Sequence, residues 1–194
     1  MWDFQEKLVP IGESVANSLG ANPTGIMQIL SWILRATFLD PRIARQAALD
    51  ENGTTAAIGA IALTAVPGLL FGFLGLGSYG INVMGLLIGT LVMSVASLGV
   101  MVAVLAMLSQ SMLGVTLSAG QLLRAIAYSQ GANMLTFVPG IGRVLQLWSI
   151  VSGVAAVREI SGATTQKVAI FMIVGALVSV AVALVLAPVV YALF

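Results

Sequence analysis

The sequence contains neither histidine nor cysteine. Without these residues the chain cannot form disulfide bonds, structural zinc sites or thiolate-held iron–sulfur clusters. Their absence also excludes the Ser-His-Asp and Cys-His arrangements of nucleophilic catalysis and a haem iron held by His or Cys. We therefore expect no cofactor, and bound lipids are the only small molecules that we predict.

Charge is also scarce, because only 8% of the 194 residues are charged and the net charge is +1. Nucleic-acid binding needs a clustered basic surface, so we predict no nucleic-acid partner. No two carboxylates stand at a recognised catalytic or metal-binding spacing. The glycines of GLGSYG lack the lysine and the Ser/Thr of a phosphate-binding loop. We therefore predict a protein without catalytic activity.

Apolar residues make up 59% of the chain, and the mean hydropathy is +1.07. Such a composition is typical of an integral membrane protein and not of a soluble domain. Ten of the fifteen charged residues lie within the first 51 positions. The sequence thus divides into an N-terminal cytoplasmic or interfacial amphipathic segment, residues 1–53, and a transmembrane domain, residues 54–194.

Five segments of the second region are long and apolar enough to cross a bilayer, which requires roughly 17 to 25 residues. They show no alternation of polar and apolar residues, so a barrel is not predicted. The fold class that we expect is all-α, a polytopic membrane helical bundle with five transmembrane helices. The predicted crossings are Thr54 to about Leu76, Ile81 to Leu108, Leu117 to Val138, Ile141 to Val157 and Val168 to Leu193.

Small residues recur four positions apart within these segments, and such faces let membrane helices approach closely. We expect most of them to pack inside the molecule. The pairs are Gly68 and Gly72, Gly85 and Gly89, Ser149 and Gly153, and Gly175 and Ser179.

The N-terminal segment contains an apolar run that is too short to be a sixth crossing. Its apolar residues recur at helical spacing, and Trp32 suits a membrane interface. This helix either lies along the cytoplasmic surface, docks on a partner or packs on its own bundle, and it ends at Asp40-Pro41. The residues that we assign to a partner-docking surface are Trp2, Phe4, Ile26, Leu30, Trp32, Ile33 and Phe38.

The basic residues are distributed unevenly between the two sides of the predicted membrane. Seven of them fall on the side of the N-terminal segment, and Arg143 alone falls on the other. The positive-inside rule then places the N-terminus in the cytoplasm and Phe194 outside. These charges fix orientation, or they bind anionic lipid headgroups. Those concerned are Arg42, Arg45, Arg158 and Lys167.

A polar stripe marks the third predicted crossing, which contains Arg124, Tyr128, Gln130 and Asn133. We expect Arg124 near the helix end, where its aliphatic stem lets the charge reach the surface. The stripe forms hydrogen bonds between helices, or it lines a path for a small molecule or a lipid.

Two stretches resemble the Yip domain family of five-span membrane proteins, in its bacterial branch. LDPRIARQAALDENGTTAAIGAIAL is similar to the entry into the first span, where a surface segment carries an Asp-Pro element. The region from QLLRAIAYSQ to KVAIFMIVG resembles the most distinctive part of the family. The matching positions are Arg124, Tyr128, Pro139, Gly140, Trp148, Arg158, Glu159, Thr165 and Lys167.

The resemblance covers about Phe38 to Val185, and it implies five spans, a cytoplasmic N-terminus and no known catalytic activity. The N-terminal element that eukaryotic members use in vesicle traffic is not visible here. We therefore expect a non-catalytic protein of the bacterial cytoplasmic membrane that contacts lipids and other membrane protein subunits, as an accessory or scaffolding subunit or a membrane organiser. The alternative is a small-molecule or lipid transporter or channel that uses the polar stripe.

Overall fold

The computed structural model describes residues 3–18, 26–50, 53–62, 83–130 and 142–193. Within these ranges the chain is helical and contains no strand, so the all-α prediction is confirmed. A helical stretch at 54–62 lies between α3 and α5. The other helices are α1 (Asp3–Asn17), α2 (Ile26–Thr37), α3 (Pro41–Leu49), α5 (Val83–Leu113), α6 (Ala119–Ser129), α7 (Gly142–Ser161) and α8 (Thr165–Leu193).

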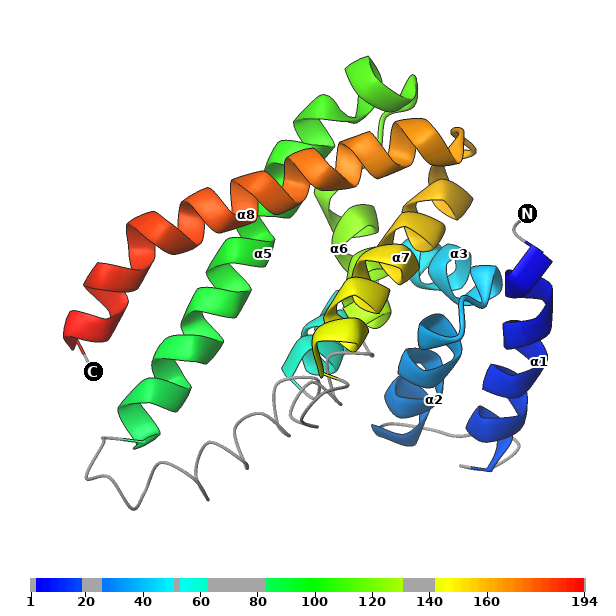
Figure 1. Ribbon diagram of the computed structural model, residues 1–194, viewed down its shortest axis with the longest axis horizontal. Helices are drawn as coiled ribbons and strands as arrows, with labels where there is room; N and C mark the ends of the chain where they lie inside the picture. Colours follow the sequence, from blue (N-terminus) through cyan, green and yellow to red (C-terminus); the bar gives the residue numbers. More distant parts are fainter. Residues whose placement is uncertain (1–2, 19–25, 51–52, 63–82, 131–141, 194) are drawn as a thin grey trace.

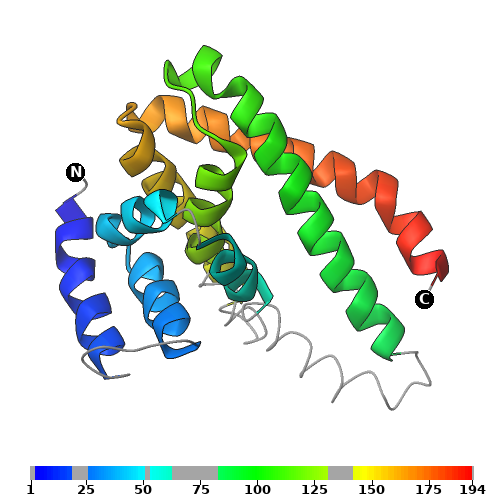
Figure 2. The same ribbon diagram turned by 180° about the vertical axis from the view of Figure 1, so that it is seen from behind.

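The two longest helices, α5 and α8, pack against each other along one side of the molecule (Figures 1 and 2). Helices α6 and α7 pack on this pair and on each other. On their other side they contact α2 and α3, and α1 packs on α2 at the edge farthest from α5 and α8. Helices α2 and α3 thus pack on the rest of the molecule through α6 and α7, and α1 packs on α2.

Local sequence signals set several helix ends. Asp40 is the N-cap of α3 and accepts a hydrogen bond from the Arg42 amide, with Pro41 in the first helical position. Ser118 and Gln121 form a reciprocal capping box at the start of α6. Predicted helix termination at Asp40-Pro41 is therefore confirmed, since α2 ends at Thr37 and a new helix begins at Pro41.

Glycines with positive φ end two of the long helices. Gly114 follows α5 with φ 78°, and its amide donates to the Gln110 carbonyl. Gly162 follows α7 with φ 66°, and its amide donates to the Arg158 carbonyl. This left-handed backbone closes a helix and is strained for residues with a Cβ atom.

The core between α5 and α8 depends on small residues, as the spacing of Gly175 and Ser179 predicts. A Cβ atom on Gly175 would lie 2.8 Å from Leu105 Cδ1. Ser97 Oγ donates to the Ser179 carbonyl at 3.2 Å, and the two hydroxyl groups also form a hydrogen bond. Because position 97 meets 179 and position 105 meets 175, the two helices run antiparallel.

Small residues also allow α7 and α8 to pack closely. A Cβ atom on Gly153 would lie 2.9 Å from Met172 Cε, and Ser149 is buried on the same helix. These close approaches confirm that the small residues of these two pairs pack inside the molecule. Gly68 and Gly72 lie outside the described residues, and the structure does not describe the surroundings of Gly85.

In the part of the chain that the structure describes, two helices and not five are long and apolar enough to cross a membrane, Leu91–Leu113 within α5 and Thr165–Val189 within α8. Helix α6 has 11 residues and is therefore about 16 Å long, roughly half of the hydrocarbon thickness. Helix α7 has 20 residues, but serines and the charged pair Arg158 and Glu159 interrupt its apolar character. Residues 63–76 and 131–138 of the first and third predicted crossings lie outside the described residues.

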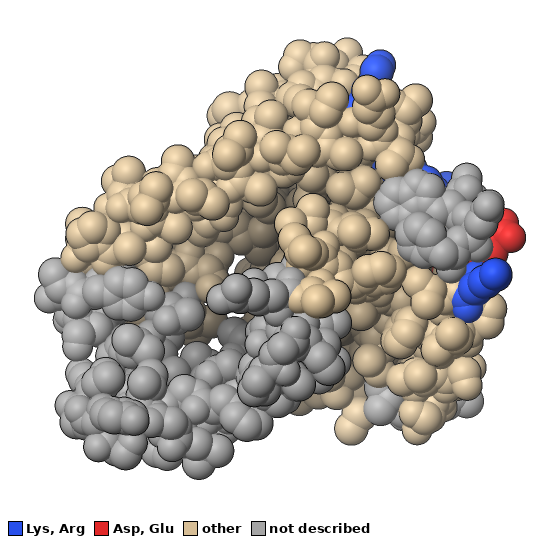
Figure 3. All heavy atoms as spheres, in the orientation of Figure 1, with Lys and Arg blue, Asp and Glu red and all other residues tan. Residues whose placement is uncertain are grey.

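Charged side chains are unevenly placed on the molecular surface. On the face shown in Figure 3 they lie over the N-terminal helices and at one end of the molecule, whereas the surface of α5 and of α8 beyond its first turn is uncharged. The surface of α8 instead presents large apolar side chains, with Leu177 65% and Leu184 72% exposed.

Candidate functional site

The turn between α2 and α3, residues 36–41, joins four helices through its backbone carbonyl groups. Ser152 Oγ donates to the Ala36 carbonyl and Trp148 Nε1 to the Thr37 carbonyl, both at 2.8 Å. Gln5 Nε2 donates to the Leu39 carbonyl, also at 2.8 Å. The last carbonyls of a helix lack amide donors from a following turn, so side chains from α1 and α7 add donors here, and the Leu39 amide also donates to the Ala36 carbonyl.

A left-handed residue gives this turn its shape. Leu39 has φ 63°, an uncommon value for a residue with a side chain. The hydrogen bond from Gln5 and the burial of the Leu39 side chain hold it in this conformation. Such strain persists only where surrounding contacts over-determine the backbone.

Asp40 places a buried carboxylate at the centre of the same turn. Arg35 Nη2 lies 2.6 Å from Asp40 Oδ2, and Arg42 Nε lies 3.1 Å from Asp40 Oδ1. Arg42 also pairs with Glu13 of α1. The hydrogen bond to Asp40, together with the negative charge of Asp40, raises the pKa of Arg42 above its ordinary value. The arrangement is an ion-pair network that holds α1, α2 and α3 together.

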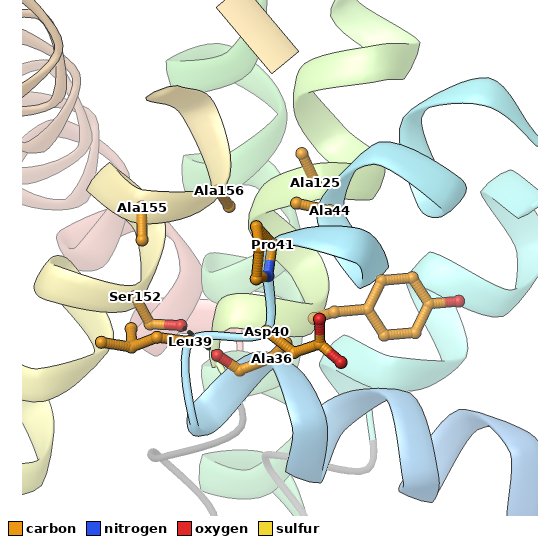
Figure 4. Close-up of a pocket in the computed structure, with 10 residues that line it drawn as sticks. Ala36, Leu39, Asp40, Pro41, Ala44, Ala125, Ser152, Ala155 and Ala156 are labelled. Atoms are coloured by element: carbon orange, nitrogen blue, oxygen red, sulfur yellow. Dashed lines mark hydrogen bonds between the residues drawn. The ribbon is translucent and has the colours of Figure 1, made fainter. Parts of the chain in front are cut away.

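A small pocket adjoins the turn, between α3, α6 and α7 (Figure 4). Its volume of about 10 Å³ has room for roughly one water molecule. Alanines from four helices make up half of its lining, and Ser152 and Asp40 add the polar atoms. The pocket is thus too small for a metabolite or a lipid, and the carboxylate beside it is already engaged by two arginines.

Arg124 fastens a second helix end. This residue is only 7% exposed, and its guanidinium donates to the Ala48 carbonyl at 2.8 Å and to Thr54 Oγ1 at 3.2 Å. Ala48 lies in the last turn of α3, where carbonyl groups attract a cation. The structure therefore places Arg124 inside the protein and not, as the sequence suggested, with its charge extended to the surface.

The other members of the predicted polar stripe occupy separate environments. Tyr128 is fully buried, with its ring edge-to-face on Trp32 at a centroid distance of 5.3 Å. Its hydroxyl has no hydrogen-bond partner among the described residues. Gln130 is half-buried at the end of α6, and Asn133 lies outside the described residues. Arg124 and Tyr128 thus face α3 and α2, respectively.

Most of the predicted partner-docking residues of α2 and the following turn pack against other residues of the same chain. Ile33 is buried, and Trp32 packs on Tyr128. Phe38 lies against Gly12 of α1, where there is no space for a Cβ atom. Leu30 is half-buried, whereas Ile26 at the start of α2 is 63% exposed.

Packing on its own bundle, one of the three alternatives for this helix, accounts for these contacts. Trp2 lies outside the described residues, and the structure does not describe the side chain of Phe4.

The basic residues assigned to topology or lipid binding separate into two groups. Arg42 belongs to the ion-pair network of the α2–α3 turn. Arg45, by contrast, pairs with Glu159 at 2.6 Å, across more than a hundred residues of sequence. Arg158 donates to Thr165 Oγ1 at 3.4 Å, and Lys167 is exposed in the first turn of α8. The pair formed by Arg45 places the N-terminal segment and the α7–α8 connection on the same face of the molecule.

The sequence did not predict the roles of three residues of this site. Gln5, Trp148 and Ser152 each donate a hydrogen bond to a distant carbonyl group, and no local sequence pattern indicates such contacts. Asp40 carried a usable signal, because Asp followed by Pro is typical of a helix N-cap. A scan against protein-family models and searches of curated proteins and solved structures gave no match to this chain.

Proposed function

We propose that this chain is a non-catalytic integral membrane protein that acts by binding, as an accessory or scaffolding subunit of a larger membrane protein complex or as a membrane organiser. The observation that carries the proposal is the outward surface of α5 and α8. Only 22% of the most apolar part of each helix is buried in the protein. A soluble protein would bury such helices in its core, so their exposed side chains favour lipid as the surrounding medium.

The contacts made by the polar side chains also favour a binding function over catalysis or transport. Asp40 and Arg124 hold helix ends, and the pocket beside the turn has room for about one water molecule. A transporter would instead need polar groups that face a path through the membrane. The resemblance of residues 38–185 to the Yip domain family implies a non-catalytic protein as well.

The finer topology belongs to the same proposal. Helices α5 and α8 are the crossings that length and composition support. We retain the other three predicted crossings within this proposal, because residues 63–76 of the first and 131–138 of the third lie outside the described part of the chain. The N-terminal helices then lie on the cytoplasmic side of a bacterial cytoplasmic membrane, and the end of α8 lies toward the outside.

Purification from the native membrane in a mild detergent, followed by measurement of the particle mass, tests this function. We expect other chains to comigrate with this protein in fixed stoichiometry. A particle that contains only this chain would contradict the subunit proposal. Solute transport by the purified and reconstituted chain, abolished by Gln130→Ala with Asn133→Ala, would favour a transporter instead.

A further inference from the structure

We propose that α1 and α2 form a helical hairpin that enters the cytoplasmic leaflet of the membrane, where its exposed apolar side chains contact lipid acyl chains. This inference rests on the proposed membrane function, because it takes α8 as a membrane crossing. It adds a third lipid-facing element to α5 and α8, and it places the hairpin within the hydrocarbon layer and not on the membrane surface.

Contacts between α7 and α8 give the depth of α7 in the membrane. The two helices are joined by residues 162–164 and pack against each other. A Cβ atom on Gly153 would lie 2.9 Å from Met172 Cε. Met172 comes seven residues after Thr165, where the stretch of α8 that is long enough to cross the membrane begins. At roughly 1.5 Å per residue, this part of α7 therefore lies about 10 Å inside that stretch.

Hydrogen bonds from α7 place the end of α2 at the same depth. Ser152, the neighbour of Gly153 in the chain, donates to the Ala36 carbonyl at 2.8 Å. Trp148, one helical turn farther from the α7–α8 connection, donates to the Thr37 carbonyl. Helix α2 thus ends inside the layer that α8 crosses.

The rest of α2 extends farther from the cytoplasmic surface. Ser129 Oγ of α6 lies 3.5 Å from the Cβ position of Gly153, and the adjacent Tyr128 packs on Trp32 in the middle of α2. Figure 1 shows α2 leading from its junction with α3 away from the α7–α8 connection, toward the end of the molecule at which α7 begins. Helix α1 packs on α2 and runs in the opposite direction (Figures 1 and 2).

The half of this helix pair that lies farther from the cytoplasmic surface exposes apolar side chains and no charge. Ile11 and Val15 of α1 and Ile26 and Met27 of α2 are between 40% and 63% exposed. Residues 14–34 contain no charged residue. Hydrocarbon excludes isolated charges and accepts apolar side chains, so this surface suits lipid acyl chains.

The charged side chains next to this apolar half neutralise one another. Glu13 pairs with Arg42, and Asp40 pairs with both Arg35 and Arg42. Two carboxylates and two guanidinium groups carry no net charge, and paired charges are the form in which a membrane interior tolerates ionised groups. The other charged residues of α1 lie at positions 3–7, in the half that begins at the cytoplasmic side.

Spin labels on single introduced cysteines test the proposal, since the chain has no cysteine of its own. The purified chain is reconstituted in phosphatidylglycerol–phosphatidylcholine liposomes. Collisions of each label are measured with oxygen, which concentrates in hydrocarbon, and with a water-soluble nickel chelate. We expect labels at Val15→Cys and Ile26→Cys to collide mainly with oxygen, as at Leu177→Cys on the exposed face of α8. Lys7→Cys, which is exposed near the start of α1, should collide mainly with the chelate.

All four substituted side chains are exposed, so these variants should retain the wild-type helix content in circular dichroism. Labels at positions 15 and 26 that collide mainly with the chelate would overturn the proposal. Low collision rates with both reagents would overturn it as well, because they would mean that protein covers the hairpin. The label at position 177 reports separately on the proposed function, since access of the chelate to it would contradict the crossing by α8 itself.

Discussion

Arg124 of α6 donates a hydrogen bond to the carbonyl oxygen of Ala48 at 2.8 Å and so closes the C-terminal end of α3. The contact joins residues 76 positions apart. The charge of Arg124 therefore lies inside the protein, where it links α3 to the bundle.

Replacement of Arg124 should therefore weaken the attachment of α3 to α6. We expect Arg124→Met to lower the free energy of unfolding by about 2 kcal/mol, because it removes charge-assisted hydrogen bonds and leaves a helix carbonyl without its donor. Arg124→Lys should restore part of the loss. Thermal unfolding in detergent measures the effect, with Lys7→Met as the control for an exposed cation. Equal melting temperatures for Arg124→Met and the wild type would show that α3 does not depend on this contact.

The carboxylate of Asp40 should be equally important for the α2–α3 turn. Asp40→Asn removes its charge but retains an N-cap acceptor, and we expect a loss of about 2–3 kcal/mol. This loss in the free energy of unfolding is smaller than that expected for a fully buried ion pair, because Arg35 and Arg42 are partly exposed to solvent.

Asp40→Ala should cost about 1 kcal/mol more, since it also removes the cap. Chemical unfolding of both variants, beside Glu6→Gln on the exposed side of α1, provides the measurement. Similar stability of Asp40→Ala and Asp40→Asn would refute the capping role.

The attachment of α1 should depend on Gln5, which is buried and donates to the Leu39 carbonyl. Gln5→Ala removes that donor and should increase amide hydrogen exchange throughout α1, with little change in α5 or α8. Glu6→Ala alters the neighbouring exposed position and should leave exchange at its wild-type rate. Protection of α1 in Gln5→Ala that equals the wild type would contradict this account.

The contact between Gly175 and Leu105 should appear as coupling between the two helices. Gly175→Ala pushes a methyl group against Leu105 and should cost about 1–3 kcal/mol. Leu105→Ala leaves a cavity and should cost about 2–5 kcal/mol. The double variant should cost less than the sum, because the new methyl group occupies part of the space that Leu105 vacates.

Gly99→Ala is the control for this cycle, since a Cβ atom there meets nothing within 4 Å. It should be neutral or slightly stabilising. Strictly additive losses in the double variant would mean that the two positions do not touch.

The pairing of Arg45 with Glu159 can be tested covalently, because the chain has no cysteine of its own. Arg45→Cys combined with Glu159→Cys should crosslink efficiently with a short bismaleimide. Both positions should also react with a membrane-impermeant maleimide from the cytoplasmic side alone. Arg45→Cys with Leu184→Cys, which lies near the far end of α8, should not crosslink. Labelling of the first two positions from opposite sides would refute the proposed orientation.

Features with a local cause were predictable from the sequence. Apolar runs predicted α5 and α8, and the small residues at 175 and 179 predicted close packing inside the molecule but not that α5 is the partner helix. Asp40-Pro41 predicted the break between α2 and α3. Helix α1 was missed, because Pro10 in its interior and its mixed polar composition obscure the periodic pattern.

Features with a distant cause were not predictable. The composition around Arg124 indicates a charge at the edge of an apolar segment, and only the folded chain brings Ala48 and Thr54 to it. For the same reason the sequence does not indicate that Glu159 pairs with Arg45. A single sequence gives no direct signal for partners that are separated by seventy positions or more.

Three donors reach main-chain oxygens at the turn after α2, where the atoms they contact are common to every amino acid. Mutations at positions 36 and 37 can therefore accumulate without loss of these contacts, provided that the new side chains fit. Over evolutionary time, positions 36 and 37 can therefore vary while the geometry of the turn is preserved, and selection acts on Asp40 and on the donors contributed from α1 and α7.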